Sequence, residues 1–297
     1  MTRASTFIDQ QRLWDHHMAI ARFGATGNGG VNRQALTPED GQARAALAGW
    51  AGERGFRLIA DEAGNLFVRR EGTDPDAPAI LSGSHLDTQP AGGNFDGIYG
   101  VLSAFEVLEA LEDGGIEHRH PIEAVVWTNE EGCRFAPGCT GSLVFSGKHQ
   151  IEEFLDFTAP DGAVLRDELE RTLAATPGAE RRQGGIPVAG YIETHIEQGP
   201  RLESAGLTVG AVTGIQGGSS FAVTVTGIDG HAGTVPLQAR RDAFRSAHGI
   251  IDALYRDLAD PSDTVRFTVG RFEAHPGSPN TIPGKVIFTI DFRHPDQ

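Results

Sequence analysis

Three short segments of the chain place histidines and carboxylates at the ends of apolar runs. They are Ser84-His85-Leu86-Asp87-Thr88 with Asp96 shortly after it, Thr128-Asn129-Glu130-Glu131-Gly132, and Gly190-Tyr191-Ile192-Glu193-Thr194-His195-Ile196-Glu197-Gln198-Gly199-Pro200. Imidazole nitrogens and carboxylate oxygens together form the ligand set of zinc, cobalt and manganese ions. A carboxylate shared between two such ions suits a two-metal centre, so the three segments together predict metal-assisted hydrolysis.

The first segment follows a short apolar run, residues 79–82, that indicates a buried strand. Ligands gather at the carboxyl ends of strands in open α/β sheets. We expect His85 to offer a neutral imidazole, Asp87 to orient that ring from the same strand face, and Asp96 to reach the same ion from a glycine-flanked loop. Taken alone, the segment equally fits a turn with capping aspartates.

The second segment ends another apolar run, residues 123–127, with two consecutive carboxylates. Adjacent residues of a strand point to opposite faces, so Glu130 and Glu131 are expected to have different roles. One would bind a cation while the other holds or moves a proton of an attacking water. On its own, the pair also fits a solvated acidic turn.

The third segment is strand-like, and its spacing predicts that Glu193, His195 and Glu197 share one face. Three polar side chains on one face lie either in solvent or in a site. Nucleophilic serine chemistry and a helical zinc motif lack support, because the sequence contains neither Gly-x-Ser-x-Gly nor His-Glu-x-x-His.

The elements that would position these segments alternate between strand and helix. The patterns predict helices around residues 7–20, from Thr37 onward and over 98–111, and a hairpin of strands 57–60 and 66–70. This order predicts an α/β fold with a mixed, largely parallel sheet and helices on both faces, formed by residues 1–211.

A second region, residues 212–297, has a different order of elements. Its patterns predict a strand over 221–225, a helix over 243–258, and strands over 265–272 and 286–292. We expect a smaller α/β sandwich that is incomplete at its C-terminal end, since a further helix and strand would be needed to close the sheet edge.

The charge balance disfavours two classes of partner. With 25 Lys and Arg against 40 Asp and Glu, the formal net charge is -15, which repels phosphate backbones and anionic lipid surfaces. No nucleic-acid or membrane partner is expected. The chain has only 2 cysteines, charges where a signal peptide needs an apolar core, and no long apolar run, so we predict a cytoplasmic protein.

Six blocks of sequence, in this order, carry a resemblance to a known family. They are Gly83-Ser84-His85-Leu86-Asp87-Thr88, Gly93-Asn94-Phe95-Asp96-Gly97, Thr128-Asn129-Glu130-Glu131-Gly132 with Arg134-Phe135, His195-Ile196-Glu197-Gln198-Gly199-Pro200, Gly230-His231-Ala232-Gly233-Thr234, and Pro279-Asn280 with Asp291-Phe292-Arg293. The chain resembles the dinuclear-metal amidohydrolases that include N-carbamoyl-L-amino acid hydrolase, allantoate amidohydrolase and β-ureidopropionase. The Asn-Glu-Glu-Gly and Glu-Gln-Gly-Pro blocks favour carbamoyl or ureido substrates over the peptides of related exopeptidases.

The resemblance implies a centre of two divalent metal ions, zinc or else manganese or cobalt. His85, Asp96 and His195 would hold one ion, and Asp96 would bridge to a second ion bound by Glu131. Glu130 would be the general base toward a water that bridges the metals and attacks the carbamoyl carbon, and it would later protonate the leaving nitrogen.

The resemblance also implies that residues 212–297 form a lid domain through which two copies make a homodimer. His231 would stabilise the oxyanion and contact the substrate, while Gln198, Asn280 and Arg293 would bind it. Because a planar guanidinium pairs bidentately with a carboxylate, Arg293 is expected to hold the free carboxylate of a small-molecule substrate. A surface salt bridge for Arg293 and a turn for Asn280 remain alternatives.

The chain departs from the family at its C-terminal end. Family members continue beyond the segment that matches Arg293 and supply a final histidine ligand, which His294 does not match. The second metal site is therefore expected to be impaired. Three explanations for the missing segment stay open: a fragment, a truncated gene product or a short variant. Three functions stay open: hydrolysis of an N-carbamoyl-L-amino acid to amino acid, ammonia and CO2; an allantoate amidohydrolase or aminoacylase-like deacylase; and a catalytically inactive dimerisation partner.

Overall fold

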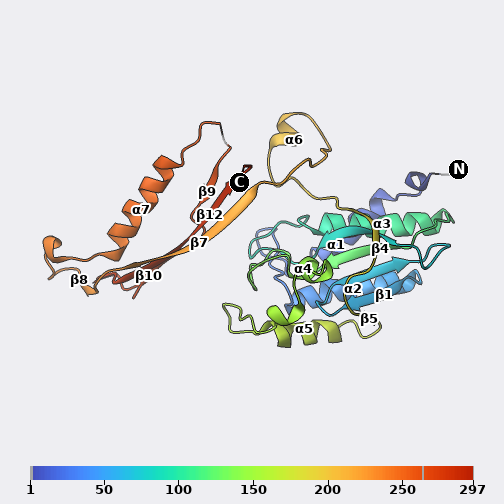
Figure 1. Cartoon of the computed structure of the whole chain (residues 1–297), viewed down its shortest axis with the longest axis horizontal. Coiled ribbons are helices and arrows are strands. Elements are labelled where there is room, and N and C mark those ends of the chain that lie inside the picture. Colours follow the sequence, from blue (N-terminus) through green and yellow to red (C-terminus); the bar gives the residue numbers. More distant parts are fainter. Residues whose placement is uncertain (1–2, 263, 297) are drawn as a thin grey trace. The chain divides into compact units, whose positions relative to one another are not determined.

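The computed structural model describes residues 3–262 and 264–296 and divides the chain into two compact units, Met1–Ala205 and Gly206–Gln297 (Figure 1). The predicted boundary, between residues 211 and 212, lies slightly further along the chain. The observed boundary begins a stretch, 206–216, that forms no helix or strand, and the predicted boundary lies within it. Among the described residues, no helix combines the length and the apolar character needed to cross a membrane.

A mixed sheet of six strands organises the first unit, in the order β5-β1-β2-β4-β3-β6. The strands are β1 (Arg57–Asp61), β2 (Leu66–Arg70), β3 (Ala79–His85), β4 (Ile122–Trp127), β5 (Glu180–Arg182) and β6 (Val188–Ile192). β2 pairs antiparallel with β1 and β4, whereas the other three pairings are parallel. The predicted mixed, largely parallel sheet is therefore confirmed, and so is the hairpin of β1 and β2.

Six helices belong to the described part of this unit. They are α1 (Gln10–Ile20), α2 (Pro38–Glu53), α3 (Ile98–Asp113), α4 (Thr140–Phe145), α5 (Leu165–Ala174) and α6 (Arg201–Ser204), with short 3-10 turns at Ala4–Thr6 and Ile151–Glu153. Helix α2 begins as its sequence predicts, because the Thr37 side chain accepts a hydrogen bond from the Asp40 amide and Pro38 occupies the first turn.

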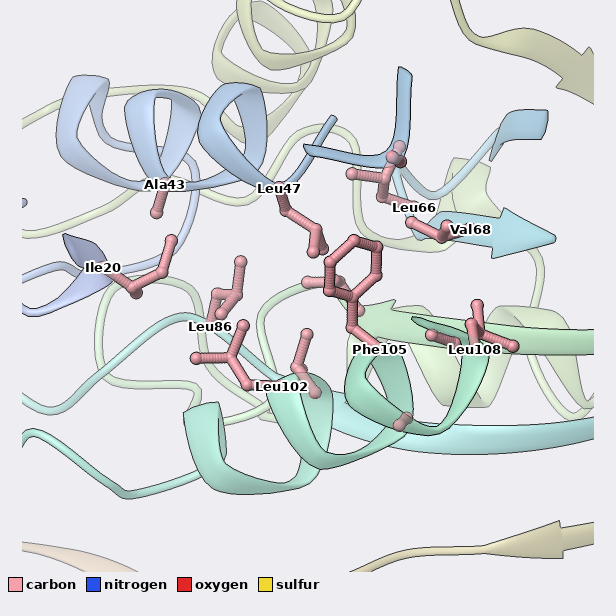
Figure 2. Close-up of a cluster of buried hydrophobic side chains, with 14 of the residues drawn as sticks. Ile20, Ala43, Leu47, Leu66, Val68, Leu86, Leu102, Phe105 and Leu108 are labelled. Atoms are coloured by element: carbon pink, nitrogen blue, oxygen red, sulfur yellow. The ribbon is translucent and has the colours of Figure 1, made fainter. Parts of the chain in front are cut away.

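The main hydrophobic core lies between one face of this sheet and helices α1, α2 and α3 (Figure 2). Leu102, Phe105 and Leu108 recur along one side of α3 and pack with Leu47 of α2 and Val68 of β2. On the opposite face, Phe67, Leu81 and Trp127 pack with Phe145 at the end of α4 and with Ile186. Helices therefore contribute to both faces, as predicted.

A buried ion pair ties α2 to the loops at the strand ends. Arg44 Nε lies 3.1 Å from the Asp40 carboxylate, and its Nη1 donates to the Gly64 carbonyl oxygen at 2.7 Å. Arg44 Nη2 donates to Thr128 Oγ1 at 3.3 Å, two residues before Glu130. The side chains of Arg44 and Asp40 are 2% and 0% exposed, so neither charge has water to replace a lost partner.

We expect Arg44→Met to lower the free energy of unfolding of this unit by about 3–5 kcal/mol, because it leaves the buried Asp40 charge uncompensated. Urea unfolding followed by tryptophan fluorescence measures this, since Trp14, Trp50 and Trp127 all lie in the first unit. The matched control is Arg119→Met, whose ion pair with Asp74 is solvent-exposed and should contribute less than about 1 kcal/mol. Equal losses for the two variants would contradict the prediction.

The second unit is an antiparallel sheet with one covering helix. Its strands are β7 (Gly217–Thr226), β9 (Arg266–Thr268), β10 (Phe272–His275) and β12 (Lys285–His294), and a two-stranded ladder joins β8 (Gly230–His231) to β11 (Thr281–Ile282). Helix α7 (Ala243–Asp257) packs Ala243 and Ala247 on Val286 and Phe288 of β12, and a 3-10 turn spans Leu237–Ala239.

One predicted strand of this unit is wrong as a single element. Within the stretch 265–272, only Arg266–Thr268 form a strand, β9, and β10 begins at Phe272 and continues to His275; both strands pair with β12. Between them the Arg271 amide donates a hydrogen bond to Thr289 Oγ1 at 3.1 Å and not to a backbone carbonyl. The residues around Gly270 therefore interrupt the regular ladder.

Candidate metal centre

Three of the predicted metal ligands meet where β3 and β6 end and α3 begins. His85 is the last residue of β3, Asp96 lies just before α3, and His195 follows β6. One ligand atom from each lies within 4.8 Å of the other two. His195 Nε2 is 3.4 Å and His85 Nε2 is 4.0 Å from Asp96 Oδ1. The cluster thus offers two nitrogens and an oxygen to one cation.

Backbone carbonyls set the tautomer of both histidines. His85 Nδ1 lies 2.7 Å from the carbonyl oxygen of Asp87, and His195 Nδ1 lies 2.9 Å from that of Ile196. Because a carbonyl oxygen only accepts, the Nδ1 of each neutral ring carries the proton. Each Nε2 lone pair, the one that faces Asp96, is therefore available to a cation.

The Asp87 carboxylate lies beside the His85 ring, with Oδ1 3.9 Å from Nδ1, but not on a shared strand face as predicted. β3 ends at His85, so the strand alternation does not reach Asp87, and the backbone carbonyl holds the ring. The Asp87 carboxylate instead accepts hydrogen bonds from the amides of Glu130 at 3.3 Å and Glu131 at 3.1 Å. Asp87 is fully buried, and this burial raises its pKa to about 6, partly opposed by His85.

Glu130 and Glu131 lie on a bend, so the expectation that strand alternation separates them is wrong. β4 ends at Trp127, and Asn129 turns the chain with a φ of 51°. The Asn129 side-chain amide donates to the Phe135 carbonyl oxygen at 2.6 Å, which holds the bend in place. The two carboxylates nevertheless diverge. Glu130 Oε2 lies 3.5 Å from His85 Nε2, whereas Glu131 Oε2 accepts a hydrogen bond from Gln89 at 3.2 Å.

The environment of Glu131 fits a nearby cation. Its Oε1 atom is buried and has no hydrogen-bond partner among the described residues. Burial first, and the charge of Asp96 in addition, raise the pKa of Glu131 to about 7, while His85 acts in the opposite direction. A positive ion beside the carboxylate would satisfy the unpaired oxygen and favour the ionised form. The donor set and this orphaned oxygen together fit a metal ion.

The prediction that Glu193, His195 and Glu197 share one strand face is wrong. β6 ends at Ile192, and beyond it the period of two no longer applies. Glu197 accepts hydrogen bonds from the amides of Arg201 at 3.0 Å and Leu202 at 2.8 Å, at the start of α6. Glu197 thus caps a helical turn, and only His195 of the three lies in the cluster.

The predicted substrate-binding residues fall in both units. In the first unit, the Gln198 side-chain amide donates to Asp96 Oδ2. In the second, the ladder of β8 and β11 brings His231 and Asn280 together, because Thr281 lies opposite His231 and the Ala232 amide donates to the Asn280 carbonyl oxygen at 2.9 Å.

Arg293 does not join this pair. It lies near the far end of β12, which at about 3.3 Å per residue is roughly 26 Å from Lys285 at the start of the strand. Its guanidinium contacts the Asp291 carboxylate at 2.8 Å, and both side chains are exposed.

Two glycines shape the cluster, a role that the sequence analysis did not assign. A Cβ on Gly97, whose φ is 68°, would lie 2.5 Å from Cδ2 of the His85 ring and closer still to Nε2. A Cβ on Gly100 would lie 2.5 Å from the Thr194 carbonyl oxygen. The sequence did contain a signal for Gly97, because it directly follows the predicted ligand Asp96. A glycine at such a position allows the backbone to approach a neighbouring side chain closely.

A mixed α/β sheet whose strand ends hold two imidazoles and a buried carboxylate defines a metal-dependent hydrolase. Residues 81–287 match the family model described as Peptidase family M20/M25/M40, and the chain belongs to that family. The predicted family and hydrolase class are confirmed.

Individual relatives agree with this assignment. The chain is 40% identical over 290 residues to an N-carbamoyl-L-amino-acid amidohydrolase of Rhizobium meliloti, covering 98% of this chain and 69% of that protein. It is 34% identical to an allantoate amidohydrolase of Bacillus subtilis (strain 168), covering 96% and 69%. The crystal structure of an amidase of the hydantoinase/carbamoylase family from Burkholderia vietnamiensis matches with a TM-score of 0.92 at 46% identity, covering 99% and 71%.

Proposed function

We propose that this protein hydrolyses the carbamoyl C–N bond of an N-carbamoyl-L-amino acid. The products are the amino acid and carbamic acid, which decomposes to ammonia and CO2, so one water is consumed. The observation that carries the proposal is the convergence of His85, Asp96 and His195 within 4.8 Å, with Glu130 Oε2 3.5 Å from His85 Nε2. A relative with 40% identity that is named for this reaction supports the choice of substrate.

The metal centre that we propose contains two divalent ions, zinc or else manganese or cobalt. His85, Asp96 and His195 would hold one ion, and Asp96 and the buried Glu131 oxygen would hold the second. When bound, such ions polarise a carbonyl group and lower the pKa of water. We assign no other residue of the chain to these ions.

Glu130 is the proposed general base. Its carboxylate lies at the edge of the cluster, with Oε2 close to His85 Nε2 and Oε1 3.7 Å from Cys139 Sγ. Within residues 3–262 and 264–296, no arginine or lysine is found bound to either oxygen. It can take a proton from a water molecule at the cluster and later return it to the leaving nitrogen. The amide hydrogen bonds from residues 130 and 131 to Asp87 hold this carboxylate beside the ligands.

Gln198, His231, Asn280 and Arg293 are the proposed substrate-binding residues. His231 and Asn280 form one cluster in the second unit and would hydrogen-bond the polar head of a substrate, with His231 stabilising the oxyanion. Arg293 would pair with a free carboxylate in place of its present partner Asp291. We further propose a cytoplasmic homodimer that associates through the second unit.

Allantoate is the second candidate substrate. The allantoate amidohydrolase of Bacillus subtilis is 34% identical over nearly the whole chain, and allantoate shares with carbamoyl amino acids a ureido group and a free carboxylate. The same ligands and the same base would serve both reactions.

A substrate panel separates these functions. The 297-residue chain, supplied with Zn²⁺, Mn²⁺ or Co²⁺, should release ammonia from N-carbamoyl-L-amino acids, and it should do so more slowly from allantoate. The uncharged N-carbamoyl amino acid amide is the matched control, and we expect it to react at least about 10-fold more slowly because it cannot pair with Arg293.

Three other outcomes are informative. Faster ammonia release from allantoate would favour the second candidate. Release of acetate from N-acetyl amino acids without ammonia release would indicate a deacylase. Stoichiometric metal binding with no turnover of any substrate would indicate a non-catalytic protein.

A further inference from the structure

Glu193 lies beside the proposed metal centre but belongs to none of the roles assigned above. It is the first residue after β6, and its carboxylate accepts two short hydrogen bonds. Ser84 Oγ donates to Oε1 at 2.5 Å, and Tyr191 Oη donates to Oε2 at 2.6 Å. Bonds of this length from hydroxyl groups to a carboxylate are charge-assisted and stronger than neutral ones.

The two donors come from different strands. Ser84 is fully buried in β3 and directly precedes His85, whereas Tyr191 belongs to β6 and lies close before His195. The ladder between these strands ends at the pair Ser82 and Ile192, so the ladder itself does not reach either histidine. The Glu193 carboxylate therefore joins β3 to the chain after β6 beyond the end of their backbone pairing.

The segment that carries His195 has little other support. Among the described residues 193–199, no backbone-to-backbone hydrogen bond is found beyond the sheet. Among the residues that the structure describes, the His195 ring hydrogen-bonds only to the adjacent Ile196 carbonyl oxygen, and its Nε2 faces Asp96. Three residues further on, the Gln198 side chain donates to Asp96 in the loop before α3. Its position depends on side-chain hydrogen bonds, and those of Glu193 are the nearest to it that reach another strand.

Two further contacts fix the geometry of this junction. Trp127 Nε1 donates to Tyr191 Oη at 2.9 Å, so the Tyr191 oxygen accepts and its one proton is left to donate. Two acceptors lie within reach of that proton, the Gly83 carbonyl oxygen at 3.1 Å and Glu193 Oε2 at 2.6 Å, and the carboxylate is the nearer and the stronger acceptor. The Thr194 carbonyl oxygen lies against Gly100 of α3, at a place where a Cβ would come within 2.5 Å. Glu193 is thus held through its side chain and Thr194 through its backbone, and the approach of Thr194 to α3 is close enough to exclude a side chain at position 100.

We propose that Glu193 is a positioning residue whose bridge between Ser84 and Tyr191 holds His85 and His195 at the spacing that binds a metal ion. The proposal rests on the metal centre of the proposed function, but it concerns binding of the ion and not turnover. Supporting groups of this kind typically change metal affinity by about 10- to 100-fold.

The test is a titration of the metal-free 297-residue chain with Zn²⁺ in competition with a chromophoric chelator. Glu193→Gln should weaken Zn²⁺ binding about 10- to 100-fold, because an amide offers one acceptor oxygen in place of two and no charge. The visible spectrum of bound Co²⁺ should also change, since it reports the coordination geometry, which loss of a remote charge alone does not alter.

The matched control is Glu197→Gln. Glu197 lies on the same segment and is also a glutamate, but the only partners of its oxygens among the described residues are the amides of Arg201 and Leu202. Zn²⁺ affinity should stay within about threefold of the unmodified chain. A loss equal to that of Glu193→Gln would show a general charge effect and overturn the proposal.

Ser84→Ala is a second test of the bridge if Glu193→Gln unfolds the protein. The Ser84→Ala change removes one hydrogen-bond donor to Glu193 and leaves the Glu193 carboxylate in place. Ser84→Ala should weaken Zn²⁺ binding. In the double variant with Glu193→Gln, the loss of Zn²⁺ binding free energy should be smaller than the sum of the losses in the two single variants. Unchanged affinity in a folded Ser84→Ala or Glu193→Gln variant would overturn the bridge while leaving the metal centre intact. If the unmodified chain bound no Zn²⁺, Mn²⁺ or Co²⁺, both this proposal and the proposed function would be wrong.

Discussion

Glu130→Gln will abolish ammonia release while metal binding persists. The amide keeps the size of the side chain but cannot accept a proton, so the general-base contribution that we propose for Glu130, roughly 100- to 10,000-fold, would be lost. The hydrogen bonds that hold this bend, from the backbone amides of residues 130 and 131 to Asp87, do not involve the Glu130 side chain. We therefore expect the bend, and the histidines beside it, to stay in place.

The comparison variant for this prediction is Glu131→Gln, one residue further along the same bend. Its buried Oε1 has no hydrogen-bond partner in the described part of the chain, and we assign it to the second ion. Glu131→Gln should lower the number of bound metal ions, whereas Glu130→Gln should not. Metal analysis by mass spectrometry alongside the turnover assay distinguishes the two. If Glu130→Gln released metal and Glu131→Gln retained it, the two roles would be exchanged.

Gly97→Ala will produce the largest loss of metal affinity that we expect from a small substitution. The new methyl group would overlap the His85 ring at Nε2, the atom that faces Asp96. In addition, the backbone at this position, with φ 68° and ψ -45°, lies in a region that residues with a Cβ rarely adopt, at a cost of about 1–3 kcal/mol. His85 must rotate or the loop must move, and either change separates the ligands. Zn²⁺ affinity should fall at least about 100-fold.

Gly93→Ala is the control for this substitution. Gly93 lies in the same glycine-rich loop, but a Cβ there meets no atom within 4 Å. Competitive Zn²⁺ titration and thermal unfolding of both variants separate a local effect on the ligands from a general effect on the loop. Wild-type affinity in a folded Gly97→Ala variant would mean that His85 does not ligate through the Nε2 position seen in the structure.

Elements with a regular side-chain period were predictable from the sequence. The stripe of Leu102, Phe105 and Leu108 defines α3, and the Thr37 cap with Pro38 defines the start of α2. The hairpin of β1 and β2 follows from apolar alternation around Gly64 and Asn65. In each case the information lies within a few residues, because burial of one face of a helix or strand requires only a local repeat.

The candidate metal ligands could be predicted from the sequence for a related reason. His85 directly ends a strand, and Asp96 and His195 lie in loops next to the sheet, and parallel strands bring their carboxyl ends to one edge. Residue type and position at a strand end were therefore enough to propose that these three side chains meet. The family motifs supplied the division of roles between Glu130 and Glu131, which the spacing alone left open.

Only the tertiary structure decided how these side chains are held. Three groups outside the regular strands hold them: the Asp87 carbonyl that orients His85, the Asp87 carboxylate that fixes the Glu130 bend, and the Glu193 carboxylate that bridges to Ser84. Asp87 and Glu193 both lie in segments without a repeating period. The interruption between β9 and β10 likewise depends on their pairing with β12. The residue types and their order determined the fold class and the candidate ligands, because periodic burial is a local property. Hydrogen bonds between irregular segments depend on where distant parts of the chain come to lie, and no local pattern contains that information.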